Sequence, residues 1–170
     1  MDLKCYTHAD ARDVRSLLLD IHDEAYANEP NPFYSRDRFS YFLDLWSSRE
    51  NWQCISGWED DVPVGYAYGS ILKPGGWWKG HRRPATTRGS VFALSELMVV
   101  PQWRGTGRAK QIHDALLEPV EADVVTLQVD SAHHKVKALY ESWGYNEAGE
   151  AKPSDDSPLF AVMAKDLKRG

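Results

Sequence analysis

Two glycines one residue apart, Gly105 and Gly107, form the part of the sequence best suited to hold an anion. Glycine adopts a positive φ without strain and lets a ligand approach the backbone closely. The apolar run 91–100 precedes this turn and an amphipathic helix follows it, so unbonded N–H groups at the helix start would point at the ligand. The helix dipole contributes only about 0.3–1 kcal/mol per charge, so hydrogen bonds and cations must supply most of the binding. The nearby cations are Arg104, Arg108 and Lys110.

Two other phosphate-binding turns fit this segment less well. The nucleoside-triphosphate loop ends in Gly-Lys-Ser or Gly-Lys-Thr, whereas Gly107 is followed by Arg108 and Ala109. The dinucleotide fingerprint requires an acidic residue about 20 residues further on and a strand that normally opens the domain. The alternative to an anion-binding site is a glycine-rich turn between strand and helix that binds no ligand. The arrangement nevertheless favours a phosphate or a diphosphate.

Two segments resemble the signatures of a known family. The run 95–107 is similar to the acyl-coenzyme A signature of the GNAT N-acetyltransferases: Gln or Arg, two residues, Gly, one residue, Gly or Ala. Arg104, Gly107 and Ala109 match that pattern. The run 138–145 looks like the second signature of the family, with its Tyr and its Gly-aromatic end. The resemblance implies a GNAT-like fold and acetyl transfer to an amine, with acetyl-CoA as co-substrate.

The resemblance also implies where the cofactor binds. In the family, the strand before the turn pairs with the pantetheine arm, and the pyrophosphate rests on N–H groups of the turn and the first helical residues. Many relatives carry an Asn seven residues before the signature Tyr, where this chain has His133. Imidazole can replace one amide contact but not its geometry. The implied cofactor-binding residues are Leu97, Met98, Val99, Arg104, Gly105, Thr106, Gly107, Arg108, Ala109, Lys110 and His133.

An amine must lose a proton before it attacks a thioester. Neutralising an alkyl amine with a pKa near ~10.4 costs roughly 4–5 kcal/mol at neutral pH. Glu96 is the acidic residue closest to the cofactor segment, and burial on an apolar strand would raise its pKa towards the useful range of a base. We therefore predict that Glu96 is the base, acting directly or through water. The alternatives are that Glu96 orients the substrate or pairs with a Lys or Arg.

Two further positions bear on the proton transfers. Tyr140 matches the tyrosine that the family is proposed to use to protonate the departing thiolate of coenzyme A. Without the resemblance, a Tyr on the apolar face of a helix more often packs with its hydroxyl at the edge. Gln128 stands where some relatives carry a glutamate base, and an amide cannot take the proton. This leaves Glu96 more weight as the base, and the resemblance implies Tyr140 as the acid.

The acceptor site is expected beside the first two helices and the segment 73–90, which Gly and Pro break too often for a regular element. Aromatic walls there suit a small, cationic amine held by cation–π contact, although such side chains more often belong to the core. The candidate substrate-binding residues are Tyr26, Tyr34, Trp77 and Trp78, with Phe33 and Trp46 as further aromatic residues of the same region.

The order of elements predicts an α/β fold with a mixed, mostly antiparallel sheet of six or seven strands flanked by about four helices. Strands are expected at 3–6, 52–58, 62–72, 91–100, 124–129, 145–150 and 159–164. Helices are expected from a capping box at Thr7 and Asp10 through Ala27, and at 36–47, 107–118 and 134–143. On the last of these helices, Val136, Leu139, Tyr140 and Trp143 should share one face.

Composition excludes several classes of function. A net charge of −5 argues against a partner with a phosphate backbone, so no nucleic acid is expected. The chain has no apolar run of about 18 residues, which argues against a membrane partner, and its start lacks a signal-peptide pattern, which favours a cytoplasmic location. Cys5, Cys54 and the pair at 133–134 lack the spacing of a metal site, so no metal is expected.

These observations predict one domain over residues 1–170. We expect an N-acetyltransferase that moves an acetyl group from acetyl-CoA to a primary amine of a small molecule or peptide by direct attack, without a covalent enzyme intermediate. The main alternative is a catalytically silent acyl-CoA-binding sensor or interaction module, and a plain interaction domain is a third. Besides the amine, a second copy of the chain is a candidate partner.

Overall fold

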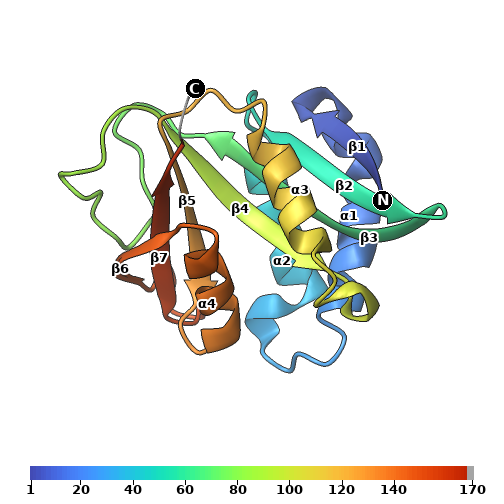
Figure 1. Ribbon diagram of the computed structural model, residues 1–170. Helices are drawn as coiled ribbons and strands as arrows, with labels where there is room; N and C mark the ends of the chain where they lie inside the picture. The colour runs from blue at the N-terminus through green and yellow to red at the C-terminus, as the bar shows by residue number, and fades with distance from the viewer. Residues whose placement is uncertain (168–170) are drawn as a thin grey trace. The chain divides into compact units, whose positions relative to one another are not determined.

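The computed structural model describes residues 1–167, in which seven strands form one sheet. The order of the strands is β1-β2-β3-β4-β5-β7-β6 (Figure 1). The β4–β5 pair is parallel, and the pairs β1–β2, β2–β3, β5–β7 and β6–β7 are antiparallel. The predicted mixed, mostly antiparallel sheet of six or seven strands is therefore confirmed. The strands are β1 (Asp2–Thr7), β2 (Gln53–Glu59), β3 (Val62–Ile71), β4 (Val91–Val99), β5 (Val124–Asp130), β6 (Asn146–Ala151) and β7 (Phe160–Asp166).

The described residues also contain four α-helices and three single turns of 3-10 helix. The N–H of Thr7 donates to Asp10 Oδ2 at 2.9 Å, so the predicted capping box is present, although it opens a 3-10 turn that leads into the first α-helix. The predicted ends of the α-helices lie within a few residues of the observed ones, which is the usual uncertainty of helix boundaries. The helices are η1 (His8–Asp10), α1 (Ala11–Ala25), η2 (Pro32–Tyr34), α2 (Arg36–Ser47), η3 (Pro101–Trp103), α3 (Arg108–Leu117) and α4 (His134–Ser142).

The chain forms two compact units, and the division between them falls inside β4. Unit 1 comprises Met1–Ser70 and Ser95–Val120. Unit 2 comprises Ile71–Leu94 and the described residues from Glu121 onwards.

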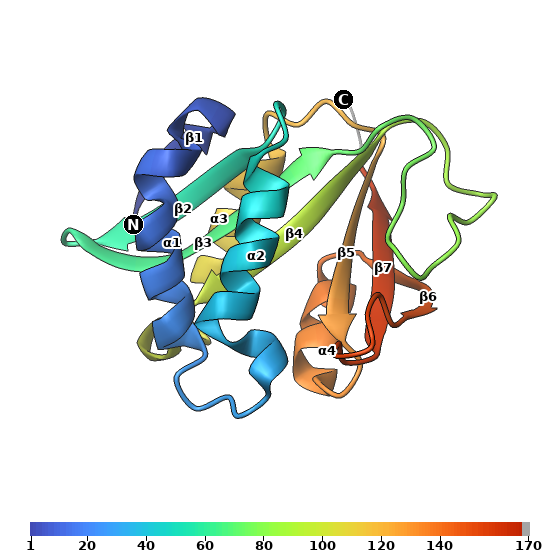
Figure 2. The same ribbon diagram turned by 180° about the vertical axis from the view of Figure 1, so that it is seen from behind.

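In unit 1, strands β1 to β3 and the end of β4 lie between helices. Helices α1 and α2 cover one face of these strands and α3 covers the other (Figure 1 and Figure 2). On the α3 side, Ile112 packs against Gly57 of β2, where an added Cβ would lie 3.1 Å from Ile112 Cδ1. The core on the side of α1 and α2 consists of Val14, Leu18, Leu19, Ile21, Phe39, Leu43, Trp52, Cys54, Tyr66, Tyr68, Met98 and Val100.

In unit 2, α4 packs on β5, and the antiparallel strands β5, β7 and β6 follow one another. Only Tyr140 of α4 is buried, whereas Val136 and Leu139 are 41% and 43% exposed. A helix of nine residues resting on one strand therefore buries a narrower stripe than its apolar pattern covers.

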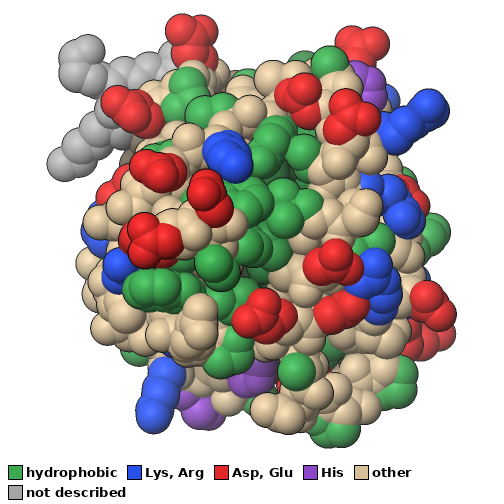
Figure 3. Space-filling model, turned by 90° about the vertical axis from the view of Figure 1, so that its right-hand side faces the viewer, with side chains coloured by type: hydrophobic (Ala, Val, Ile, Leu, Met, Phe, Trp, Pro, Cys, Tyr) green, Lys and Arg blue, Asp and Glu red, His purple; other side chains and the backbone are tan. Residues whose placement is uncertain are grey.

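Charged side chains are spread over the face of the molecule drawn in Figure 3. On this face, Asp and Glu surround a central group of hydrophobic side chains, and Lys and Arg are scattered among them rather than gathered into one patch. Across residues 1–167, no helix combines the length and the apolar character that crossing a bilayer requires.

Candidate functional site

The end of β4 lies very close to Gly65 of β3. A Cβ on Gly65 would lie 2.2 Å from Met98 O and 2.9 Å from Val99 Cα, which is far inside van der Waals contact. Only glycine therefore fits at this position. The sequence analysis missed Gly65, although an isolated glycine inside a strand pattern is a known signal of a close backbone approach.

β4 also contains one residue more than β3 over the same stretch. The N–H of Val100 donates to Val64 O at 2.9 Å, and the N–H of Leu72 donates to Val91 O at 2.8 Å, so one additional residue of β4 must be accommodated between these two bonds. Such a β-bulge leaves backbone groups out of the ladder and is common beside active sites. The three residues predicted to pair with the pantetheine arm, Leu97 to Val99, lie within this stretch.

The turn after β4 has the predicted backbone conformation. Gly105 and Gly107 have φ angles of 73° and 84°, and no heavy atom would lie within 4 Å of an added Cβ on either residue. The first helical bond that follows joins Gln111 N–H to Gly107 O, so the N–H groups of Arg108 and Ala109 precede the hydrogen-bonded part of α3. An open turn with alternating left-handed residues at a helix start fits a diphosphate.

The three predicted cations around this turn all contact protein groups. Arg104 donates from Nε to Val99 O at 3.1 Å and from Nη2 to Ala25 O at 2.8 Å. Arg108 donates to Glu59 Oε1 and lies over the ring of Trp103, while Lys110 donates to Asp114. Carboxylates therefore compensate Arg108 and Lys110, whereas the recorded partners of Arg104 are neutral carbonyls. The charge of Arg104 remains the least compensated of the three.

Glu96 is half-buried on β4, and burial raises its pKa from the ordinary value of 4.5 to about 8. The predicted direction of this shift is confirmed. Within residues 1–167, Glu96 has no hydrogen-bond or ion-pair partner, so the structure offers no support for the ion-pair alternative. Burial raises the pKa of Tyr66 and Tyr68, and the negative charge of Glu96 raises both further. Glu96 therefore lies in the electrostatic neighbourhood of these two hydroxyls.

The thiol closest to this region is unsuited to nucleophilic catalysis. Cys54 is buried on β2, and burial raises its pKa far above the ordinary range. The thiolate is the nucleophilic form of cysteine, so Cys54 stays in its inert form at neutral pH. Cys5 is exposed on β1.

Tyr26 and Tyr34, two of the predicted substrate-binding residues, belong to a stack of four rings. Tyr34 stacks on Tyr26 with centroids 5.1 Å apart, Tyr26 on His22 at 4.7 Å, and His22 on Phe39 at 4.1 Å. Burial lowers the pKa of His22 even though its Nδ1 lies 3.6 Å from Asp23 Oδ1. A neutral imidazole therefore connects the two tyrosines to the core of unit 1.

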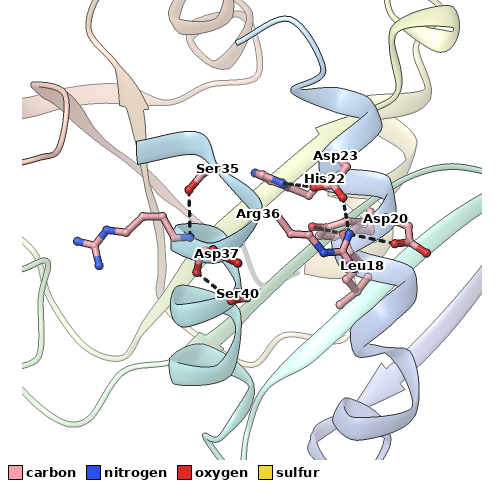
Figure 4. A network of polar contacts seen from close by, with 10 residues as sticks. Leu18, Asp20, His22, Asp23, Ser35, Arg36, Asp37 and Ser40 are labelled. Carbon is pink, nitrogen blue, oxygen red and sulfur yellow. Dashed lines mark hydrogen bonds and ion pairs between the residues drawn. The ribbon is translucent and has the colours of Figure 1, made fainter. Parts of the chain in front are cut away.

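An arginine at the start of α2 ties that helix to α1 beside the ring stack. Arg36 donates to Asp20 Oδ1 at 3.0 Å and also to Asp23, as Figure 4 shows. The sequence analysis missed both Arg36 and His22. Exposed ion pairs contribute little individually, but this pair of contacts fixes where the segment between the two helices begins and ends.

The other predicted site residues lie in unit 2. Trp77 Nε1 donates to His81 Nδ1 at 2.8 Å, and Trp78 Nε1 donates to Thr126 Oγ1 at 2.9 Å. His133 is exposed at the start of α4. Tyr140 is buried and makes edge-to-face contacts with Trp143 and Tyr145, at centroid distances of 5.3 and 5.6 Å. Trp78 is therefore anchored on β5, while Tyr140 belongs to an aromatic cluster.

The described part of the chain contains no group of three or more His, Cys, Asp and Glu side chains that could hold a metal ion. The donor groups near the turn are backbone amides and Arg side chains, which suit an anionic ligand rather than a cation.

Residues 16–145 match the family model described as "Acetyltransferase (GNAT) family". No curated protein matches the chain in sequence.

Solved structures of similar fold cover nearly the whole chain. Aminoglycoside 6'-acetyltransferase type Ii is 16% identical with a TM-score of 0.66, and the match covers 100% of both chains. The ribosomal-protein-S18-alanine N-acetyltransferase from Escherichia coli is 16% identical with a TM-score of 0.65, covering 99% of this chain and 96% of that one. The PaiA N-acetyltransferase from Thermoplasma acidophilum, solved in complex with coenzyme A, is 12% identical with a TM-score of 0.58, covering 98% and 100%. At these identities the likeness is one of fold.

Proposed function

Since the chain belongs to the acetyltransferase (GNAT) family, we propose that it acetylates a primary amine of a small molecule or peptide by direct attack on acetyl-CoA. Membership of the family makes the protein an acetyltransferase with acetyl-CoA as its co-substrate. The observation that carries the proposal is Glu96, a carboxyl without a partner among residues 1–167 whose pKa of about 8 suits a base.

The backbone of the turn would hold the diphosphate of the cofactor. Gly105 and Gly107 leave open space at the start of α3, and the N–H groups of Arg108 and Ala109 precede its first helical bond. The least compensated charge near this turn, on Arg104, would add attraction for the anion. Leu97, Met98, Val99 and His133 complete the proposed cofactor contacts. Thr106 and Lys110 belong to the same turn and helix start.

In the proposed reaction, Glu96 takes a proton from the ammonium, and the amine nitrogen then forms a bond to the acetyl carbon. The carbon–sulfur bond breaks, and the thiolate of coenzyme A leaves with a proton supplied by Tyr140. The nitrogen then loses its second proton, which restores the Tyr140 hydroxyl through solvent. Since the only buried thiol near Glu96 is held in its neutral form, direct attack needs no acetylated enzyme. Tyr26 and Tyr34 are proposed to line the acceptor site, with Trp77 and Trp78 as further candidates.

The identity of the acceptor can be tested with a panel of amines. Small amines, aminoglycosides and peptides with free amino termini would be incubated with acetyl-CoA, and release of free thiol would be measured. Turnover of at least one amine is expected. Thermal stabilisation by acetyl-CoA without thiol release from any amine would instead favour a silent acyl-CoA-binding module.

Tyr140→Phe tests the acid. We expect kcat for the best amine to fall about a hundredfold, since general acid catalysis typically contributes about 10²–10⁴-fold. The affinity for coenzyme A, measured by calorimetry, should stay within about threefold. Because the Tyr140 ring packs against Trp143 and Tyr145, Phe keeps that packing and serves as its own control for folding. An unchanged kcat would remove Tyr140 from the mechanism.

Arg104→Met tests the cation at the turn. The variant loses the hydrogen bonds to Val99 O and Ala25 O together with the charge, so we expect coenzyme A to bind at least about tenfold more weakly. The KM for the amine should also rise, because Ala25 directly precedes Tyr26. Lys110→Met is the comparison variant: since Asp114 already compensates Lys110, it should weaken coenzyme A binding less than Arg104→Met does. Equal effects of the two substitutions would contradict this assignment.

The same proposal includes a cytoplasmic location, an amine rather than a nucleic acid as partner, and the assembly of two copies into a homodimer. Size-exclusion chromatography coupled to light scattering tests the last of these.

A further inference from the structure

Two tyrosines of β3, Tyr66 and Tyr68, are both fully buried but differ in their hydroxyl groups. Their rings stack at 6.0 Å with an interplanar angle of 9°. Tyr66 Oη donates to Leu18 O at 3.2 Å. Tyr68 Oη has no hydrogen-bond partner anywhere in residues 1–167. Two neighbouring side chains of one type therefore have opposite hydrogen-bonding states.

An unpartnered buried hydroxyl is unusual. Most buried side-chain polar atoms have a partner, and exceptions need an explanation. The ring of Trp52 lies 5.6 Å from that of Tyr68, and its Nε1 is also buried without a partner in the described chain. The fold therefore keeps two polar atoms here that no group of the described chain satisfies.

The adjacent strand brings a second polar group without a protein partner to this region. β4 neighbours β3, and Glu96 is the residue of β4 whose charge acts on the Tyr68 hydroxyl. The aromatic ring of Tyr26, a proposed substrate-binding residue, packs against the core cluster that contains Tyr68. The Tyr68 hydroxyl and the Glu96 carboxyl therefore both lack a partner within residues 1–167 on the proposed acceptor side.

We propose that Tyr68 Oη and the Glu96 carboxyl bind the same small polar group, which is a water molecule before the acceptor arrives and the amine nitrogen afterwards. The inference rests on the proposed function. Tyr68 Oη accepts a hydrogen bond from an N–H of the amine, while Glu96 receives its proton. Tyr68 is therefore an orienting residue of the acceptor site, and a tertiary amine, whose ammonium form has a single N–H, cannot satisfy both partners.

Tyr68→Phe and Tyr66→Phe form a matched pair that separates this role from packing. Tyr68→Phe should leave the Tm unchanged or raised, because no group within residues 1–167 loses a hydrogen bond. It should lower kcat/KM for the amine about tenfold or more while leaving the affinity for coenzyme A unchanged. Tyr66→Phe should lower the Tm by about 2–4 °C, because it leaves Leu18 O without its donor, and should change kcat/KM less than about threefold.

A second readout does not depend on turnover. In Tyr68→Phe, the pKa of Glu96, followed by carbon-13 NMR of its carboxyl, should rise above the wild-type value because the carboxylate loses the water molecule that it shares with the Tyr68 hydroxyl. Tyr66→Phe should leave that pKa unchanged. If the pKa moves but no amine is acetylated, the inference stands and the proposed function fails. An unchanged Glu96 pKa in Tyr68→Phe overturns the inference, whatever the turnover.

Discussion

Glu96→Gln is expected to lower kcat for amine acetylation by about 10²–10³-fold, the range typical for the loss of a general base. Gln has nearly the same shape as Glu but cannot take a proton, so binding of both substrates should persist. Steady-state kinetics with the best amine of the panel measures the loss in kcat, and calorimetry with coenzyme A checks that the cofactor still binds. A kcat within about threefold of wild type would show that Glu96 is not the base.

The pH dependence of the wild type provides a second test of Glu96. Because its pKa is raised to about 8, most Glu96 carboxyls are protonated at pH 7 and cannot act as a base. The kcat/KM should therefore rise about tenfold per pH unit below pH 8, apart from the ionisation of the amine itself, and level off above it. In Glu96→Gln, the rise of kcat/KM with pH below pH 8 should disappear. If the rise persists in the variant, it reports the ionisation of another group.

Stability against pH serves as the control for folding of the same variant. The pKa of Glu96 is higher in the folded protein than its ordinary value of 4.5, so its contribution to stability is fully present below that value. It is lost as pH rises from about 4.5 to about 8, because the folded state holds on to a proton that the unfolded state releases. Glu96→Gln carries no such charge, so it should be at least as stable as wild type at pH 8. If Glu96→Gln were less stable than wild type, its loss of activity would not be evidence that Glu96 is the general base.

Gly65→Ala is expected to have the largest effect on the fold. The new Cβ would lie 2.2 Å from Met98 O, and a backbone oxygen cannot move without shifting β4. We expect a loss of about 3 kcal/mol or more in the free energy of unfolding, at the upper end of overpacking effects. Coenzyme A should bind at least about tenfold more weakly, because Met98 and Val99 belong to the proposed cofactor strand. Urea denaturation and calorimetry measure the two effects.

Gly57→Ala is the matched control for Gly65→Ala. Gly57 pairs with Gly65 across β2 and β3, but its added Cβ would meet the ends of two flexible side chains, Met1 Sδ at 2.7 Å and Ile112 Cδ1 at 3.1 Å. These atoms can move, so we expect a loss of only about 1 kcal/mol and an unchanged affinity for coenzyme A. Similar losses in both variants would mean that the close approach at Met98 has no special role.

Features that depend on neighbouring residues were predictable from the sequence. The limits of α2 agree with the prediction, and Ser35 at its start accepts a hydrogen bond from Arg38 N–H. The left-handed glycines of the cofactor turn were also predictable, because a strand, two glycines and a helix in close succession allow few backbone paths. The raised pKa of Glu96 followed from its apolar strand.

Features that depend on distant residues were not predictable. Arg104 bonds to Ala25, which is 79 residues away, so its motif position alone could not reveal that partner. The glycine at 65 is required by the oxygen of Met98, and the imidazole of His22 is stacked by a ring from α2. In each case the decisive contact forms only when separate elements pack, so the sequence does not identify the partner, even where, as at Gly65, it signals a close approach.

The link through Arg36 has a consequence for how acceptor choice could diverge among descendants of this protein. Arg36 binds the last turns of α1 to the start of α2 and so sets the distance between these two helix ends. The residues from Tyr26 to Asn31 lie in the connection between them. Short surface connections of this kind tolerate insertions and replacements at low cost to folding. A few substitutions or insertions in this connection could therefore change which amine binds, while the residues that bind acetyl-CoA stay the same.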